Sequence, residues 1–208
     1  MILQSAVVSM YGTNCYVLGS ESTKNGIVID PGGDAEIIGS IINKWGLNIR
    51  LVIATHIHGD HTGALRPVLK FTGAKFAIHE DPGVGFTAQS VGNKRELVSP
   101  YLGDMPAPDI WLKDTQNIAV DDLSFKVTHT PGHTSGGICL IGDGIVFSGD
   151  TLFNYGIGRT DFPGGDYDTL ISSIRNKLML LPDDTIVYPG HGPSTTIGNE
   201  RRGNPFLR

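Results

Sequence analysis

Three histidines and one aspartate lie within six consecutive residues, in the stretch HIHGDH from His56 to His61. In an extended chain, residues two apart project to the same side, so His56 and His58 can bind one metal ion. Gly59 allows the chain to turn, and Asp60 and His61 then point toward a neighbouring position. Imidazole and carboxylate groups in this combination suit a divalent ion such as Zn²⁺. The stretch therefore predicts the centre of a metal site.

Three further side chains of metal-binding type each follow a stretch that is typical of a buried strand. They are His133 in TPGHT, Asp150 in SGDT and His191 in PGHG. Each lies on a turn that contains glycine, where the backbone can pack close to an ion. A lone loop histidine is usually an ordinary polar surface residue, but together with the first stretch these positions supply seven donors. Seven donors are enough for two ions that share a bridging ligand.

The elements that must position these side chains are predicted from hydrophobic periodicity and turn residues. Strands are expected at Ile2–Val8, Asn14–Leu18, Gly26–Ile29, Ile49–Ala54, Lys75–Ile78, Ile110–Leu112, Leu123–His129, Gly137–Ile141, Ile145–Ser148 and Thr185–Tyr188. Helices are expected from the N-cap Asp34 to Trp45, over Gly63–Phe71 and over Tyr167–Leu181.

The strands form two groups, each followed by a helix, and this order favours two sheets packed face to face with helices outside. We therefore expect an α/β (α+β) fold in a single domain over residues 1–208. The secondary structure of residues 81–105 is the hardest to predict, because glycine and proline interrupt a weak helical periodicity.

The charge and composition of the chain exclude several classes of function. The formal net charge is −5 and no basic run is longer than Arg201-Arg202, so nucleic acid is not an expected partner. No apolar stretch approaches the roughly 18 residues of a membrane span, and the N-terminus lacks the features of an export signal. Cys15 and Cys139 lie in separate apolar stretches and are expected to be buried thiols. We expect a cytoplasmic protein without a membrane partner, and the sequence does not indicate its oligomeric state.

Taken in order, the motifs resemble those of the metallo-β-lactamase superfamily. The matching stretches are IDPGG at 29–33, HIHGDH at 56–61, TPGHT at 130–134, GDTLF at 149–153 and PGHG at 189–192. The resemblance implies a four-layer αββα sandwich, in agreement with the two groups of strands. It also implies two metal sites that share a bridging carboxylate. These sites would be formed by His56, His58 and His133 and by Asp60, His61 and His191, with Asp150 as the bridge.

Longer stretches narrow the resemblance to hydroxyacylglutathione hydrolases, also called glyoxalase II. These stretches are HTPGHTSG at 129–136 and GDTLFNYGIGR at 149–159, and the ending at 190–207 is similar to short, bacterial-type members. Full glyoxalase II proteins carry an additional C-terminal helical domain that helps to hold glutathione, which the short type lacks. The resemblance implies hydrolysis of a small-molecule thioester, whereas the identity of the thiol carrier stays open.

Two residues are candidates for contact with the substrate. Arg159 lies where the family places a basic residue near the substrate, and it could bind a substrate carboxylate. The alternative is an ion pair with Asp161 or Asp166 that holds the loop. Tyr155 could line the same pocket or pack against its neighbours.

Three other polar residues lie near the motifs and match no ligand position. Asp30 is expected to anchor a loop beneath the metal site. His79 and His129 are expected to be structural or to support the ligands.

The expected chemistry is hydrolysis with metal-activated water. Two adjacent cations, Zn²⁺ first with iron or manganese as alternatives, would lower the pKa of a bridging water from about 15.7 to 7. The resulting hydroxide, positioned by Asp60 and by the bridging Asp150, would attack the thioester carbonyl. A thiolate, whose parent thiol has a pKa of about 8.5, leaves without prior protonation, so a dedicated general acid is not needed. We therefore predict a metal-dependent thioester or ester hydrolase.

The main alternative is a persulfide dioxygenase on the same scaffold. Such enzymes resemble this chain and use one Fe(II) held by two histidines and one aspartate, which His56, His133 and Asp150 could supply. They usually carry an AHD-type sequence where this chain has GHG around His191, and this difference favours the hydrolase. A purely structural metal site is disfavoured, because structural zinc sites are usually closed and rich in cysteine.

Overall fold

The first of two six-stranded sheets is formed mainly by the N-terminal half of the chain. In the computed structural model, which describes residues 1–81, 87–91, 94–99 and 103–208, its strand order is β1-β2-β3-β4-β5-β9. The strands are β1 (Ile2–Val8), β2 (Thr13–Gly19), β3 (Asn25–Ile29), β4 (Asn48–Ile53), β5 (Lys75–His79) and β9 (Ile110–Leu112). The first three pair antiparallel, whereas β3, β4, β5 and β9 are parallel.

The second sheet has the order β10-β11-β12-β13-β16-β17. Its strands are β10 (Asn117–Val120), β11 (Leu123–His129), β12 (Ile138–Ile141), β13 (Ile145–Gly149), β16 (Ile186–Pro189) and β17 (Thr195–Thr196). All neighbours are antiparallel except β13 and β16, which are parallel. Every predicted strand is present in the two sheets with its ends shifted by at most one residue, while β10 and β17 were not predicted.

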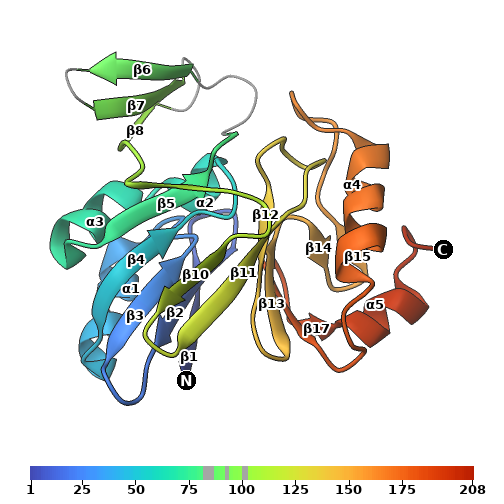
Figure 1. Ribbon diagram of the computed structural model, residues 1–208, viewed down its shortest axis with the longest axis horizontal. Helices are drawn as coiled ribbons and strands as arrows, with labels where there is room; N and C mark the ends of the chain where they lie inside the picture. The colour runs from blue at the N-terminus through green and yellow to red at the C-terminus, as the bar shows by residue number, and fades with distance from the viewer. Residues whose placement is uncertain (82–86, 92–93, 100–102) are drawn as a thin grey trace.

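Helices cover the outer faces of both sheets (Figure 1). The first sheet carries α1 (Ala35–Trp45) and α3 (Leu65–Thr72), and the second carries α4 (Tyr167–Ser173), the π-helix η1 (Ile174–Leu178) and α5 (Ile197–Gly203). Smaller elements are α2 (Gly59–Thr62), β14 (Leu152–Phe153), β15 (Gly156–Ile157) and a separate three-stranded sheet of β6 (Thr87–Val91), β7 (Lys94–Ser99) and β8 (Gly103–Met105).

Alternation along the strands divides the apolar side chains among three packed clusters. On β2, Val17 packs with the cluster beneath α1 and α3, whereas Leu18 packs with the cluster between the sheets. On β13, Phe147 joins the cluster between the sheets and Val146 joins the one beneath α4 and α5. The arrangement is a four-layer αββα sandwich, and the expected fold class is confirmed.

Several details differ from the expectations. Asp34 precedes α1, but its φ is +48° and its carboxylate accepts a hydrogen bond from Ser9 N at 2.8 Å instead of capping the helix. The helix that begins at Tyr167 ends at Leu178 and does not extend to Leu181, because Pro182 disfavours helical geometry at the residue before it, Leu181. The weak helical periodicity noted over 81–105 does not correspond to a helix in the described part of this segment, which forms the strands β6, β7 and β8; residues 82–86, 92–93 and 100–102 lie outside the described residues.

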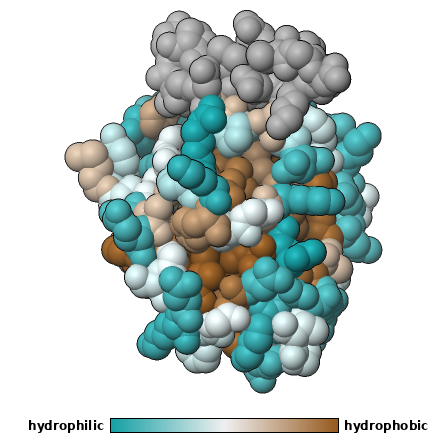
Figure 2. Space-filling view, turned by 90° about the vertical axis from the view of Figure 1, so that its left-hand side faces the viewer, coloured by the Kyte–Doolittle hydropathy of each residue, from teal (hydrophilic) through white to brown (hydrophobic). Residues whose placement is uncertain are grey.

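The face covered by α1 and α3 is shown in Figure 2, where hydrophilic side chains surround a central group of apolar ones. Exposed apolar residues on these two helices include Ile37 and Phe71. Among the described residues, none of the helices has the length and apolar character needed to cross a membrane.

Candidate metal centre

The expected ligands meet at one edge of the two sheets because their loops follow strands that end there. The stretch from His56 to His61 follows β4 and enters α2. His133 follows β11, Asp150 follows β13 and His191 follows β16. Because β13 and β16 are parallel, the loops that carry Asp150 and His191 leave the same edge of the second sheet.

The first group of donors consists of His56, His58 and His133. Nδ1 of His58 lies 3.1 Å from Nε2 of His56 and 2.9 Å from Nε2 of His133. Tetrahedral ligands held about 2.0–2.1 Å from a zinc ion are about 3.4 Å apart. The three nitrogen atoms therefore approach the spacing of ligands to a single ion.

The second group consists of Asp60, His61 and His191. Nε2 of His61 lies 3.3 Å from Nε2 of His191. Oδ2 of Asp60 lies 3.2 Å from Nε2 of His191 and 3.6 Å from Nε2 of His61. The contacts again have the spacing that a shared ion requires.

Asp150 lies between the two groups. Its Oδ2 is 3.5 Å from Nε2 of His133 in the first group and 3.6 Å from Nε2 of His191 in the second. Its Oδ1 is 3.2 Å from Nε2 of His61. The structure thus brings all seven expected ligands together, with the aspartate in contact with both groups.

The donor set fits two divalent cations. Oδ1 of Asp150 is buried and has no hydrogen bond of acceptable geometry, and such an unpaired buried acceptor costs about 1–3 kcal/mol. Ring nitrogens that face one another at 2.9–3.3 Å also need a proton or a cation between their lone pairs. Cations at the centres of the two groups would satisfy both requirements.

Hydrogen bonds to the outer ring nitrogens orient two of the histidines. His61 Nδ1 donates to Oδ2 of the buried Asp30 at 2.9 Å. His133 Nδ1 donates to the carbonyl oxygen of Arg159 at 2.6 Å. Each bond places the proton on Nδ1, which leaves the Nε2 lone pair for the metal. Asp30 also accepts hydrogen bonds from Thr55, so its expected anchoring role is confirmed.

Asn14 holds the turn that carries His191, although the sequence analysis did not identify it. Its Nδ2 donates to the carbonyl oxygens of Pro189 at 3.0 Å and Gly192 at 2.8 Å. The hydroxyl of Tyr16 donates to the Pro189 oxygen at 2.7 Å. Asn14 is 175 residues from Pro189, and no local pattern indicates this contact.

A glycine is required beside the bridging position. A Cβ atom at Gly190 would lie 2.2 Å from Oδ1 of Asp150 and 2.7 Å from Cε1 of His61. Any side chain at this position would therefore displace a proposed ligand, which explains the glycine before His191 in the PGHG motif.

Burial keeps the first group of histidines neutral. Burial and, next, the neighbouring His133 lower the pKa of His58 to about 4. Burial also lowers the pKa of His56 and His133 below the ordinary histidine value. Neutral imidazole is the form that binds a metal, so this group is ready to do so at neutral pH.

The second group binds protons more strongly in the metal-free chain. Burial acts to lower the pKa of His61, but the charges of Asp30 and Asp150 raise it well above the ordinary value. The hydrogen bond with Asp60 raises the pKa of His191. A divalent cation in this group would replace these protons.

The two candidate substrate residues lie on the segment that follows Asp150. Arg159 forms a two-pronged ion pair with Asp161, with Nε–Oδ1 and Nη2–Oδ2 distances of 3.0 and 2.8 Å, which is one of the two expected alternatives. Tyr155 is 52% exposed, and its backbone N–H donates to the buried Glu200 at 2.9 Å. Its ring packs against Gly203 of α5, as a packing role would require.

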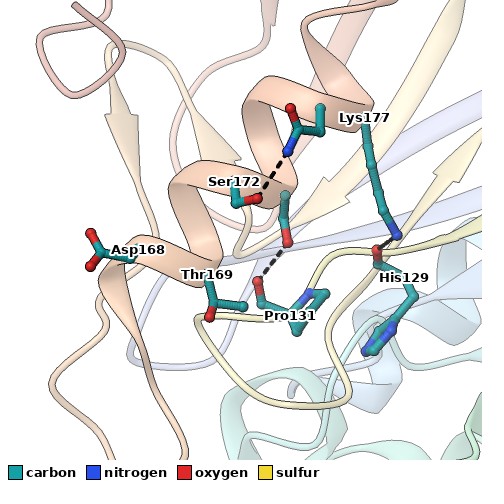
Figure 3. A pocket seen from close by; sticks show the side chains of 8 residues that line it. His129, Pro131, Asp168, Thr169, Ser172 and Lys177 are labelled. Atoms are coloured by element: carbon teal, nitrogen blue, oxygen red, sulfur yellow. Dashed lines mark hydrogen bonds between the residues drawn. The ribbon is translucent and has the colours of Figure 1, made fainter.

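A groove of about 440 Å³ lies beside the loop that carries His133, and none of the seven expected ligands lines it (Figure 3). In this groove the hydroxyl of Ser173 donates to the carbonyl oxygen of Pro131 at 2.8 Å. Lys177 donates to the carbonyl oxygen of His129 at 2.5 Å and pairs with Asp114 at 3.1 Å. These contacts attach the loop that carries His133 to α4 and η1.

His79 and His129 lie outside both donor groups. Their rings stack with centroids 4.1 Å apart and an interplanar angle of 15°. His129 Nε2 also donates to the carbonyl oxygen of Ser135 at 2.6 Å, within the loop that leads from His133 to β12. These contacts agree with the structural role expected for the pair.

Comparisons with known proteins agree with this arrangement. Residues 9–191 match the family described as the metallo-beta-lactamase superfamily. A relative from Haemophilus influenzae named hydroxyacylglutathione hydrolase GloC is 39% identical over all of this chain and 98% of its own length. The solved structure of the BLEG-1 B3 metallo-beta-lactamase is 33% identical, with a TM-score of 0.86 over 99% of both chains. ETHE1 from Myxococcus xanthus is 30% identical, with a TM-score of 0.82 over 99% of this chain and 84% of the other.

Proposed function

This chain belongs to the metallo-beta-lactamase superfamily, and we propose that it is a thioesterase of the hydroxyacylglutathione hydrolase type that uses two divalent ions. The observation that carries the proposal is the presence of two complete donor groups in contact with one carboxylate, Asp150. The name of the relative from Haemophilus influenzae supports the type of reaction. The imidazole-rich donors favour Zn²⁺, with iron or manganese as alternatives. The substrate is a small-molecule thioester.

The residues around the centre suit an attack by water on a carbonyl group. When bound, two divalent ions would lower the pKa of water and polarise the carbonyl. Burial acts to raise the pKa of Asp60, but the hydrogen bond with His191 and the charge of His61 lower it, so this carboxylate is ionised at neutral pH. Its Oδ2 is also held by the hydroxyl of Thr13 at 3.2 Å. Asp60 would therefore accept a hydrogen bond from the attacking water and orient it.

The leaving group determines which acyl compounds the centre can cleave. A thiol has a pKa of about 8.5, so a thiolate departs without prior protonation, whereas an amine needs an acid. A thioester therefore places the smallest demand on the surrounding residues.

A persulfide dioxygenase is the second candidate, and the similarity to ETHE1 favours it. That reaction would use one iron held by His56, His133 and Asp150, and it would leave the group around Asp60 without an ion. The close spacing of Asp60, His61 and His191 supports the hydrolase instead.

Metal analysis and substrate assays on the same preparation test the proposal. Protein purified without added metal should contain two divalent ions per chain and should hydrolyse S-lactoylglutathione or a simple acyl thioester. A single iron with oxygen consumption on glutathione persulfide would establish the second candidate instead. Fast turnover of the β-lactam nitrocefin without thioester hydrolysis would exclude both.

A further inference from the structure

A buried carboxylate lies outside both donor groups. Glu200, on α5, is fully buried, although glutamate is usually exposed. Its Oε1 accepts a hydrogen bond from the hydroxyl of Thr195 at 2.7 Å. Its Oε2 accepts hydrogen bonds from the backbone N–H of Tyr155 at 2.9 Å and from Nδ2 of Asn204 at 2.8 Å. Both oxygens are therefore used, and the carboxylate joins α5 to the turn between β14 and β15.

The turn that Glu200 holds belongs to a hairpin that follows the bridging Asp150 along the chain. Its strands, β14 and β15, form a two-stranded sheet of their own, apart from the two large sheets. Nδ2 of Asn204, at the end of α5, also donates to the carbonyl oxygen of Gly156 at 3.0 Å. The tip of the hairpin is therefore fastened to α5.

Tyr155 occupies this turn in a conformation that needs support. Its φ is +53°, in the left-handed region that a tyrosine rarely adopts. Such residues persist where their surroundings fix them. The hydrogen bond from its N–H to Glu200 and the packing of its ring against Gly203 fix this one. Loss of the carboxylate would allow the turn to relax and would shift β15.

The chain after β15 leads directly to the support of a metal ligand. A Cβ atom at Gly158 would collide with the carbonyl oxygen of Asp150 and would lie 3.1 Å from Cβ of His133. The chain therefore packs closely against both ligand-bearing loops. The next residue, Arg159, accepts the hydrogen bond from Nδ1 of His133 through its carbonyl oxygen at 2.6 Å. A shift of β15 would therefore move the oxygen that orients His133.

We propose that Glu200 is a positioning residue of the metal centre, which acts through the β14–β15 hairpin to hold the Arg159 carbonyl oxygen against His133. This inference rests on the metal centre of the proposed function, but it does not depend on which acyl compound is cleaved. Glu200 lies outside the donor groups, so its effect on the ions is transmitted by the hairpin alone.

The second donor group should depend less on Glu200 than the first. Thr195 follows the loop that carries His191, but it is also held by its pairing with Val187 in the second sheet. The ring of His61 is held by Asp30, which follows β3 of the first sheet. Neither support passes through the hairpin.

Two substitutions separate the reach of the Glu200 side chain from its charge. Glu200→Gln keeps the reach, because its amide oxygen can accept from Tyr155 and Asn204 while its amide nitrogen donates to the hydroxyl of Thr195. Glu200→Asp keeps the charge but is one methylene group shorter, so it cannot contact both Thr195 and Tyr155. A positioning role predicts that Glu200→Gln resembles the wild-type protein, whereas Glu200→Asp and Glu200→Ala do not.

The first readout is the affinity of each donor group for zinc, measured by titration against a competing chelator. Glu200→Asp and Glu200→Ala should weaken binding in the first group about tenfold, because supports of ligand histidines contribute about 10- to 100-fold and Glu200 acts through one of them. Asp183→Asn is the matched control, because Asp183 also holds α5, through Arg201 and Arg202. It should leave both affinities unchanged.

The second readout needs no metal. In the metal-free protein with isotope-labelled histidine, NMR measures how fast the Nδ1–H protons of His133 and His61 exchange with water, and His133→Asn assigns the first of them. Exchange at His133 should be faster in Glu200→Asp than in the wild-type protein. Exchange at His61, which donates to Asp30, should be unchanged.

Two results would overturn the inference. If Glu200→Asp unfolds at a lower temperature but keeps the wild-type zinc affinity and exchange at His133, Glu200 only stabilises the fold. If Glu200→Asp resembles the wild-type protein while Glu200→Gln is impaired, the charge acts and not the hydrogen bonds. Should Glu200→Ala fail to fold, Glu200→Asp decides. If the wild-type protein binds one ion or hydrolyses no thioester while exchange at His133 still depends on Glu200, the proposed function fails but the positioning role stands.

Discussion

Oδ2 of Asp30 accepts a hydrogen bond from Nδ1 of His61 at 2.9 Å, and both side chains are buried. The bond aims the other ring nitrogen of His61 at the second donor group. Asp30 follows β3 with a φ of +53° and also accepts hydrogen bonds from the backbone and hydroxyl of Thr55, so it is held by the segment after β4 as well as by the histidine. Asp30 would therefore support the ligand His61, and it belongs to neither donor group.

Asp30→Asn should weaken metal binding in the second group about 10- to 100-fold, because supporting hydrogen bonds of ligand histidines contribute on that scale. The first group should still bind its ion. Titration with zinc in the presence of a competing chelator measures both affinities. Asp34→Asn is the control, because Asp34 lies in the same loop as Asp30 and its carboxylate accepts a hydrogen bond from the backbone N–H of Ser9. Equal affinities in Asp30→Asn and the wild-type protein would show that Asp30 does not support the site.

Asp150→Asn should empty at least one of the two sites and lower kcat by more than about 100-fold, because it removes the charge that both ions would share. The fold should persist, since the apolar clusters of both sheets do not include Asp150. Elemental analysis and the thermal unfolding temperature check the two statements. Asp143→Asn, on the exposed hairpin before β13, is the control. Full metal content and full rate in Asp150→Asn would contradict the proposed bridge.

Acidification should release the two ions in two steps. The pKa of His61 is raised by Asp30 and Asp150 against the effect of burial, so protons compete with the metal in the second group already at or above pH 6.5. Burial lowers the pKa of His58 to about 4, so protons displace the metal from the first group only at lower pH. Metal content after dialysis at a series of pH values measures both steps. His58→Ala should remove the low-pH step alone, and release in the reverse order would contradict the expected difference.

The kinetics of Arg159 variants distinguish a role in substrate binding from a role in stabilising the loop. If it binds a substrate carboxylate, Arg159→Ala should lower kcat/KM about 10- to 100-fold for carboxylated substrates, and Arg159→Lys should recover only part. Asp161→Asn should then preserve the rate, because it leaves the guanidinium in place. If the ion pair only holds the loop, Arg159→Ala and Asp161→Asn should have equal effects on all thioesters. Steady-state kinetics on substrates with and without a carboxylate distinguish the two.

The sequence by itself determined which side chains could bind metal and which strands carry them. Apolar runs and the turn residues between them predicted the ends of the main strands to within one residue, because these strands pack between a helix layer and the other sheet, and β2, for example, is buried along its whole length. β10 escaped prediction because only Ile118 is buried along it. α5 escaped because its buried residues include Glu200, a residue type that is usually exposed.

Only the tertiary structure decided how the donors and their supports are grouped. Three contacts join residues that are far apart in sequence. Asp150 contacts both donor groups, Asn14 forms hydrogen bonds with the turn that carries His191, and the Phe162 ring lies beside His58. Asn14 and Gly192, for example, are separated by 178 residues. Local patterns carry no signal for such contacts, because they depend on the pairing of β13 with β16 and on the packing of one sheet against the other.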